Sequence, residues 1–361
     1  MNNHFKIVIA GKRNAGKSTL MNLLTAQQVS IVSPVPGTTT DPVSRRMEIP
    51  GIGICTFVDT AGIDDTGILG EERVKKTFAE LRSADLVLVV GESELPGISK
   101  FESSTIHITE FDEQSRDKIL TEIASRLSGK RGRTILEGLV REGDRIILVC
   151  PIDDEAPQGR LILPQVMAIR DILDKKGIAE VMQPEELEGF LKSNSNVKLV
   201  VTDSQAFKEV SRIVPEDIPL TSFSILLARS NGPFETYLSG MDSLERLEDG
   251  DRILMLESCA HHATCNDIGR VKIPKLLASK TGKRLEFDFV SGLGELQIPV
   301  EQYALAIQCG GCMITPLEIR ERLRPIIDAG IPAINYGMAL AWANGIFERA
   351  VRLFMQESAL K

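Results

Sequence analysis

The chain has 361 residues, of which 43% are hydrophobic and 25% charged, an ordinary balance for a folded protein of two or three domains. Its net charge of −8 excludes a large basic surface for nucleic acid or anionic lipid, and an aromatic content of 5% disfavours base-stacking platforms. We find no secretory segment and no apolar run of membrane-spanning length, so we expect a cytoplasmic protein with six reduced cysteines and neither nucleic-acid nor membrane partners.

Residues 1–131 alternate predicted strands and helices, as a parallel α/β domain does. Strands are expected at 7–10, 53–58 and 86–90, and the last is apolar on both faces, as buried parallel strands are. Helices are expected near 18–25 and at 118–127. The polar, Gly-rich run at 128–133 is typical of a linker.

The turn after the first strand has the pattern of a phosphate-binding loop. Gly11-Lys12-Arg13-Asn14-Ala15-Gly16-Lys17-Ser18 matches G-x-x-x-x-G-K-[ST] and stands between a strand and a helix, as this motif requires. Lys17 is predicted to reach the β- and γ-phosphates, and the Ser18 hydroxyl is predicted to ligate Mg²⁺. The predicted nucleotide-binding residues are Gly11, Asn14, Ala15, Gly16, Lys17, Ser18 and Thr19.

Two further segments occur in the order expected of a GTPase. Asp59-Thr60-Ala61-Gly62 follows a strand, which predicts that Asp59 holds Mg²⁺ through water and that the Gly62 amide senses the γ-phosphate. Pro36-Gly37-Thr38-Thr39-Thr40-Asp41 lies where the first switch belongs, so Thr39 is predicted to ligate Mg²⁺. The predicted catalytic residues are Lys17, Thr39, Asp59 and Gly62.

This set resembles the Era/TrmE group of GTPases. The resemblance implies that Asn14 helps to bind an activating K⁺. Ile63 stands where Ras-like proteins carry a catalytic glutamine, which fits K⁺-assisted hydrolysis. The guanine-reading tetrapeptide Asn/Thr-Lys-x-Asp is absent, and residues 91–104 are too few for the usual helix, strand and base-reading loop. Ser99-Lys100-Phe101-Glu102 is the nearest remnant, so phosphate binding is predicted here without a clear guanine reader.

A second α/β stretch, residues 138–222, carries no recognisable catalytic constellation. Strands are expected at 145–150, 179–182 and 197–201, and helices at 165–175, 185–192 and 205–214. A segment of this kind between two segments with chemistry is often a scaffold or an oligomerisation unit. Cys55 and Cys150 lie in apolar strands and are predicted to be core residues.

The third segment, residues 223–361, contains two groups of cysteines. Strands are expected at 253–256, 284–290 and 303–307, and helices at 235–247, at 274–280, after the N-cap Thr315 with Glu318 completing a capping box, and at 338–355. Cys259-Ala260-His261-His262, with Cys265 close behind, follows the first of these strands. Gln308-Cys309-Gly310-Gly311-Cys312 follows the third. Two strand ends of one parallel sheet can bring Cys259, Cys309 and Cys312 together.

Four interpretations of these cysteines remain open from spacing. An iron–sulfur cluster is favoured, because two thiolates three residues apart converge on one metal and the glycines free the backbone around it. A zinc site with Cys265 as fourth ligand is the second, although its C-x₅-C spacing is wide. Cycling of Cys309 and Cys312 as a redox dithiol is the third, and inert buried thiols are the fourth.

The chain resembles the FeFe-hydrogenase maturation GTPases of the HydF family, whose signature joins Cys-x-His to a later His-Cys-x-x-Cys. Cys259-Ala260-His261 is followed, after 46 residues, by Gln308-Cys309-Gly310-Gly311-Cys312. Residues 149–162, 267–274 and 335–337 also resemble the family. The resemblance covers nearly the whole chain, and it implies a GTPase domain at 1–131, a dimerisation domain at 138–222 and a 4Fe–4S domain at 223–361. Together these predict a three-domain α/β chain of parallel sheets with a shortened P-loop domain.

The resemblance also implies a 4Fe–4S cluster held by Cys259, Cys309 and Cys312, with GTP, Mg²⁺ and K⁺ as the other cofactors. The cluster's open iron site would receive a transient di-iron precursor. The implied partners are a second copy of the chain, the radical-SAM hydrogenase maturases and the apo-hydrogenase. Gln308 departs from the family's His, so the fourth iron position falls to His261, His262, Cys265, water or the precursor.

Overall fold

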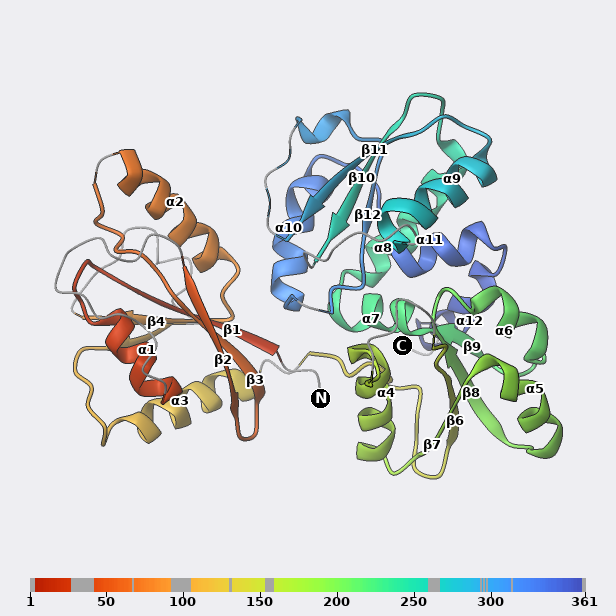
Figure 1. Ribbon diagram of the computed structural model, residues 1–361, viewed down its shortest axis with the longest axis horizontal. Coiled ribbons are helices and arrows are strands. Elements are labelled where there is room, and N and C mark those ends of the chain that lie inside the picture. The colour runs from red at the N-terminus through yellow and green to blue at the C-terminus, as the bar shows by residue number, and fades with distance from the viewer. Residues whose placement is uncertain are drawn as a thin grey trace. The chain divides into compact units, whose positions relative to one another are not determined.

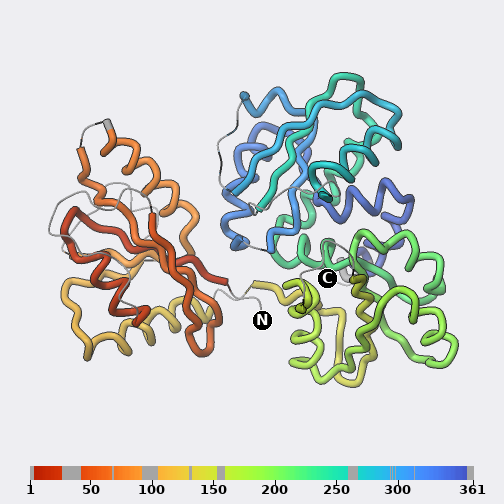
Figure 2. Tube along the Cα trace, in the orientation of Figure 1, coloured from red at the N-terminus to blue at the C-terminus, as the bar shows by residue number. Residues whose placement is uncertain are grey.

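The computed structural model describes residues 4–26, 42–66, 68–91, 105–129, 132–152, 159–258, 267–292, 294, 296, 298–312 and 314–358. The chain divides into two compact units, Asn2–Gly132 and Arg133–Lys361 (Figures 1 and 2). Each unit is built on parallel sheet, which confirms the predicted α/β fold class. Within the described part of the chain, no helix is long and apolar enough to cross a membrane.

The first unit contains a five-stranded sheet in the order β2-β3-β1-β4-β5. Only β2 is antiparallel to its neighbour. The elements are β1 (His4–Gly11), α1 (Lys17–Thr25), β2 (Val43–Ile49), β3 (Gly53–Asp59), α2 (Ile68–Arg82), β4 (Leu86–Val90), β5 (Thr105–Ile108) and α3 (Arg116–Ser128). The carboxyl ends of β1 and β3 therefore lie side by side, which brings the phosphate loop next to the Asp59 segment.

Helices cover both faces of this sheet. α1 and α3 pack on one face through residues such as Leu20, Leu24 and Ile123, over a core that includes Cys55. α2 packs on the other through Leu81. Strands covered on both faces are apolar along their whole length, which explains why the run at 86–90 was predictable from composition.

The second unit opens with a four-stranded parallel sheet in the order β7-β6-β8-β9. The elements are β6 (Arg145–Val149), α4 (Leu163–Asp174), β7 (Ile178–Met182), α5 (Pro184–Ser193), β8 (Val197–Thr202), α6 (Phe207–Ile213) and β9 (Leu220–Ser222). Cys150, directly after β6, is 4% exposed, and Cys55 in the first unit is fully buried, so both predicted core cysteines are confirmed.

A second four-stranded parallel sheet of the same unit has the order β11-β10-β12-β13. Its strands are β10 (Arg252–Glu257), β11 (Glu286–Ser291), β12 (Leu305–Gln308) and β13 (Ala333–Asn335). Its helices are α7 (Phe223–Asn231), α8 (Phe234–Gly240), α9 (Ile273–Thr281), α10 (Pro316–Asp328), α11 (Tyr336–Ala343) and α12 (Phe347–Ser358), with short helical turns η2 (Met241–Arg246), η3 (Ile268–Lys272) and η4 (Val300–Gln302).

The two sheets of this unit share one continuous hydrophobic core. α7 is central to it, because it contacts α4 on the first sheet's side and β13 and α11 on the second sheet's side (Figure 1).

Two of the helices predicted from the sequence are wrong in extent. The helix expected at 235–247 is α-helical only to Gly240 and then tightens into the 3₁₀ turn η2. The helix expected at 338–355 is α11 and α12, separated at Gly345, whose φ of 73° does not continue an α-helix.

Candidate functional sites

The phosphate loop of the first unit has the backbone shape that its sequence predicts. It joins the end of β1 to α1, with Asn14 at φ 58° and Gly16 at φ 93°, both in the left-handed region. The Lys17 side chain is buried and folds back over the loop, where its Nζ donates to the carbonyl oxygens of Lys12 at 2.8 Å and Gly11 at 3.3 Å. Burial lowers the pKa of Lys17, and the nearby carboxylates of Asp59, Asp64 and Asp65 oppose that shift.

Ser18 and Asp59, the two residues predicted to serve Mg²⁺, lie together. The Ser18 hydroxyl donates to Asp59 Oδ2 at 2.5 Å. Asp59 is 1% exposed, and its Oδ1 has no hydrogen-bond partner within the described part of the chain. Burial raises the pKa of Asp59, against the opposing effects of Ser18 and Lys17. A buried carboxylate oxygen without a partner is costly, and a divalent cation or its water shell would satisfy it.

Gly62 packs directly against the phosphate loop. A Cβ at Gly62 would lie 2.4 Å from Arg13 Cγ and 2.7 Å from Arg13 N, so only glycine fits. The contact is reinforced on both sides, because Arg13 N donates to Asp64 Oδ1 at 2.7 Å and the Arg13 guanidinium pairs with Asp65 at 3.3 Å. The two segments are therefore coupled through Arg13, a residue that the sequence analysis gave no role.

The part of the first unit that would contact the base of a bound nucleotide is short in this chain. β5 is the parallel neighbour of β4, with Leu88 opposite Ile106, and only residues 91–104 separate the two strands along the chain. Phe111, after β5, lies against the phosphate loop, so that a Cβ on Gly16 would sit 3.2 Å from its ring. Thr39, the other predicted Mg²⁺ ligand, and the remnant at 99–102 lie outside the described residues.

The cysteine centre of the second unit lies at the carboxyl edge of the second sheet. β10 and β12 are parallel neighbours, with Leu256 opposite Gln308, and Cys309 N donates to Leu256 O at 3.0 Å. The prediction that the two cysteine groups follow strand ends of one parallel sheet is confirmed for the strands, β10 and β12, which the structure places side by side. Cys259, His261, His262 and Cys265 lie outside the described residues.

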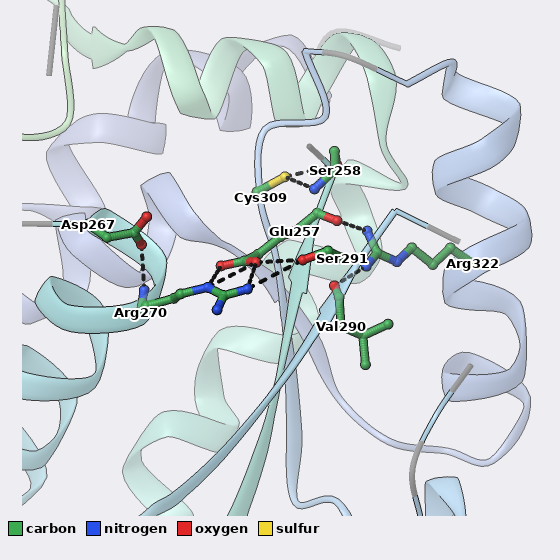
Figure 3. A network of polar contacts seen from close by, with 8 residues as sticks. All are labelled: Glu257, Ser258, Asp267, Arg270, Val290, Ser291, Cys309 and Arg322. Atoms are coloured by element: carbon green, nitrogen blue, oxygen red, sulfur yellow. Dashed lines mark hydrogen bonds and ion pairs between the residues drawn. The ribbon is translucent and has the colours of Figure 1, made fainter. Parts of the chain in front are cut away.

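The Cys309 sulfur lies against Ser258 at this edge (Figure 3). Its Sγ lies 2.9 Å from Ser258 Oγ, 3.2 Å from Ser258 N and 3.5 Å from Gln308 Nε2. Gln308 is fully buried. Sequence reasoning gave no role to Ser258, although its place directly after β10 and before Cys259 was a usable signal.

The glycines between Cys309 and Cys312 lie close to neighbouring side chains, and Gly311 is also favoured by its backbone conformation. Gly311 has a φ of 69°, and a Cβ there would lie 2.4 Å from Ile319 Cδ1. A Cβ on Gly310 would come within 3.2 Å of Leu227 on α7. The Cys309–Cys312 loop is thereby held between α7 and α10, and both cysteines are partly exposed.

Charged groups behind Cys309 brace the strand ends (Figure 3). Arg322 on α10 donates to the carbonyl oxygens of Glu257, at 2.8 Å, and Val290. Arg270 forms a two-pronged contact with the Glu257 carboxylate, at 2.8 and 3.0 Å, and Ser291 donates to the same carboxylate at 2.8 Å. Burial lowers the pKa of Arg322, while the proximity of Cys309 raises it.

Three buried polar atoms at this edge have no hydrogen-bond partner among the described residues: Gln308 Oε1, Arg322 Nε and the Tyr336 hydroxyl. Within the described ranges no three Cys, His, Asp or Glu side chains are grouped to hold a metal ion. Cys309 offers a soft sulfur at which the N–H groups of Ser258 and Gln308 are directed. This arrangement suits an iron–sulfur ligand, because cluster thiolates accept such hydrogen bonds.

Comparison with protein families finds three matches along the chain. A 50S ribosome-binding GTPase model matches residues 6–126, a hydrogen maturase F (HydF) dimerization domain matches 135–232, and a HydF tetramerization domain matches 235–353. These matches define a GTPase-type nucleotide-binding domain followed by two assembly domains. The chain is a HydF-like protein with an Era/TrmE-like GTPase domain. The two assembly domains support oligomerization, and the tetramerization match extends the predicted dimer.

Among curated proteins the chain is similar to tRNA modification GTPases MnmE. The relative from Cereibacter sphaeroides is 34% identical over 146 residues, which are 40% of this chain and 32% of the relative. The relative from Thermotoga petrophila is 28% identical over 242 residues, 64% and 48% of the two chains. The chain therefore spans only about a third to a half of these relatives. Era from Aquifex aeolicus is 18% identical over 90% of this chain and 98% of its own, at a TM-score of 0.24, too low to support a conclusion.

Proposed function

We propose that the protein is a GTP-binding iron–sulfur scaffold or carrier in the maturation of FeFe hydrogenase. Cys309, Cys312 and Cys259 would hold a 4Fe–4S cluster, with an exchangeable fourth position that takes a transient di-iron precursor; His261 is one candidate for that position. Radical-SAM maturases would supply the precursor, and the apo-hydrogenase would receive it. The observation that carries this proposal is the sulfur of Cys309, held at the sheet edge by Ser258 in a HydF-like domain.

Anaerobic reconstitution tests the cluster. The wild-type chain should bind iron and sulfide and give the absorption and EPR spectra of a 4Fe–4S centre, and Cys309→Ser should lose most of both. Cys55→Ala, which removes a buried thiol of the other unit, is the matched control and should retain the full content. A chain that binds zinc without sulfide, or a Cys309→Ser variant with its cluster intact, would overturn the proposal.

The nucleotide site follows the same proposal. Lys17 would contact the β- and γ-phosphates with the backbone of Gly11, Asn14, Ala15, Gly16, Lys17, Ser18 and Thr19, while Ser18, Thr39 and, through water, Asp59 would hold Mg²⁺. Asn14 would hold K⁺, and the Gly62 amide would sense the γ-phosphate. The pairing of Ser18 with Asp59 and the unpartnered Asp59 Oδ1 support the Mg²⁺ assignment.

Measuring GTP turnover tests the nucleotide site. K⁺ should stimulate GTP turnover, and Lys17→Ala should abolish GTP turnover. Comparing GTP with ATP shows whether the shortened base side still distinguishes them.

The alternative functions are an RNA-linked GTPase with a zinc site and a redox-sensing dithiol. The MnmE relative from Cereibacter sphaeroides aligns with 40% of the chain, whereas the two HydF domain models match residues 135–232 and 235–353, which favours the scaffold.

A further inference from the structure

We propose that Gln308 is a positioning residue for Cys309: together with Ser258 it forms a hydrogen-bond chain that ends on the Cys309 sulfur and raises the reduction potential of the cluster bound there. The inference rests on the proposed function, because it requires a cluster at Cys309. Gln308 stands where the HydF signature has His, and its proposed role is to donate hydrogen bonds toward Cys309, a ligand of the cluster.

The Gln308 side chain is held in one place. It is fully buried at the end of β12, between β10 and β13. Its Nε2 donates to Ser258 Oγ at 3.1 Å and to Cys309 O at 3.1 Å, and it lies 3.5 Å from Cys309 Sγ. The carbonyl of Gln308 accepts from Asn335 Nδ2 at 3.2 Å, which fixes the backbone.

The orientation of the amide follows from its neighbours. Cys309 O is an acceptor only, so the atom of Gln308 that faces it must be the nitrogen. The other amide atom, Oε1, is buried without a partner in the described part of the chain. The Gln308 side chain is therefore oriented so that its N–H groups are satisfied and its oxygen is not, which makes it a hydrogen-bond donor at this edge.

The donor chain reaches the sulfur through Ser258. When Cys309 is a thiolate, the Ser258 hydroxyl can turn to donate to Sγ across 2.9 Å, while its oxygen accepts the Gln308 N–H. Linked hydrogen bonds polarise and strengthen one another. Ser258 N–H, at 3.2 Å, is a further donor. Hydrogen bonds to a ligating sulfur stabilise the more negative, reduced cluster, so they raise its potential.

The test uses the full chain, reconstituted anaerobically, with iron and sulfide counted first and the midpoint potential then measured by EPR during titration with dithionite, the one-electron donor. Gln308→Met keeps the side-chain length and removes the donors. Ser258→Ala removes the hydroxyl but keeps the backbone N–H. Gln165→Met is the matched control, because Gln165 is also a buried glutamine, 4% exposed, but it bonds Asp203 beside the other sheet.

We expect wild-type iron content in all three variants. The equilibrium constant for one-electron reduction should fall three- to tenfold in Gln308→Met and Ser258→Ala, where tenfold corresponds to 59 mV, and should not change in Gln165→Met. Unchanged potentials in loaded Gln308→Met and Ser258→Ala would overturn the inference and leave the proposed function standing. Absence of a cluster from the wild-type chain would overturn both. If Gln308→Met loses its iron, Ser258→Ala decides by the same criterion.

Discussion

Gly62 lies where the Asp59 segment packs against the phosphate loop, with no room for a side chain. An added Cβ would meet Arg13 N at 2.7 Å, and a backbone atom cannot rotate away. Gly62→Ala should therefore push the Asp59 segment off the phosphate loop. We expect a loss of about 1–3 kcal/mol in the unfolding free energy of the first unit, the usual cost of overpacking. Chemical denaturation of the full chain measures it.

The control for that substitution is Gly129→Ala, at the end of α3. Gly129 has a φ of −79°, and an added Cβ would have nothing within 4 Å, so its unfolding midpoint should not fall. Equal midpoints for Gly62→Ala and wild type would mean that the two segments are not in contact in solution.

Buried and partly exposed cysteines should differ sharply in reactivity. Burial raises the pKa of both Cys55 and Cys150 to about 12. At pH 8 their thiolate fraction is therefore minute, and the thiolate is the reactive form. Iodoacetamide at pH 8 should modify Cys309 in the cluster-free native chain and leave the other two unmodified, as peptide mass spectrometry can show.

The raised pKa values of Cys55 and Cys150 also determine how the free energy of unfolding changes with pH. Since the folded-state pKa of about 12 exceeds that of an unfolded thiol, about 8.5, the neutral thiols contribute fully to stability below about pH 8.5. That contribution is lost as the pH rises towards 12. Rapid alkylation of Cys150 at pH 8 without denaturant would contradict this burial.

At the scale of elements, α10 depends on its cap. Thr315 Oγ1 accepts from Glu318 N at 3.2 Å and Glu318 Oε2 accepts from Thr315 N at 2.8 Å, so the predicted capping box is confirmed. Thr315→Ala should lower the unfolding free energy of the second unit by about 1 kcal/mol. Thr315→Ser keeps the hydroxyl and should stay close to wild type. A Thr315→Ser loss as large as that of Thr315→Ala would show that the methyl group, not the cap, matters.

The elements that sequence reasoning identified are those with a strong local signal. The apolar run of β4 was placed at its true ends, and Thr315 was recognised by its partner Glu318. α7 was missed because it is buried on several sides, which removes the polar stripe that marks an amphipathic helix. β9 and β13 have three residues each, too few to show a period.

The candidate cysteine site was predictable only in part for a similar reason. A Cys-x-x-Cys pair after a strand is visible in the sequence, and so is the order of the strands that carry it. The contact between Ser258 and Cys309 depends on the register of β10 with β12, and the position of Arg322 behind them depends on how α10 packs. Such tertiary relations leave no trace in local spacing.

At the scale of the whole molecule, the dimerization-domain match has a physical counterpart. α4 exposes Val166 at 47% and Leu173 at 59%, and the edge strand β7 exposes Ile178 at 46% and Val181 at 45%. An edge strand beside exposed aliphatic side chains is poorly suited to water and well suited to a second protein surface. We therefore predict that α4 and β7 form the contact between two copies of the chain.

The double substitution Val166→Glu and Leu173→Glu tests this contact. Two carboxylates per copy would be buried opposite one another, so the mass measured by light scattering should fall to half of the wild-type mass or less. Both positions are solvent-exposed in the single chain, so its fold should survive, as circular dichroism can confirm. Leu69→Glu, at a 66% exposed position on α2, is the control and should leave the mass unchanged. An added carboxylate disrupts assembly only where it lies in a contact between copies. If Leu69→Glu alone lowered the mass, the contact would lie on the first unit and the prediction for α4 and β7 would be wrong.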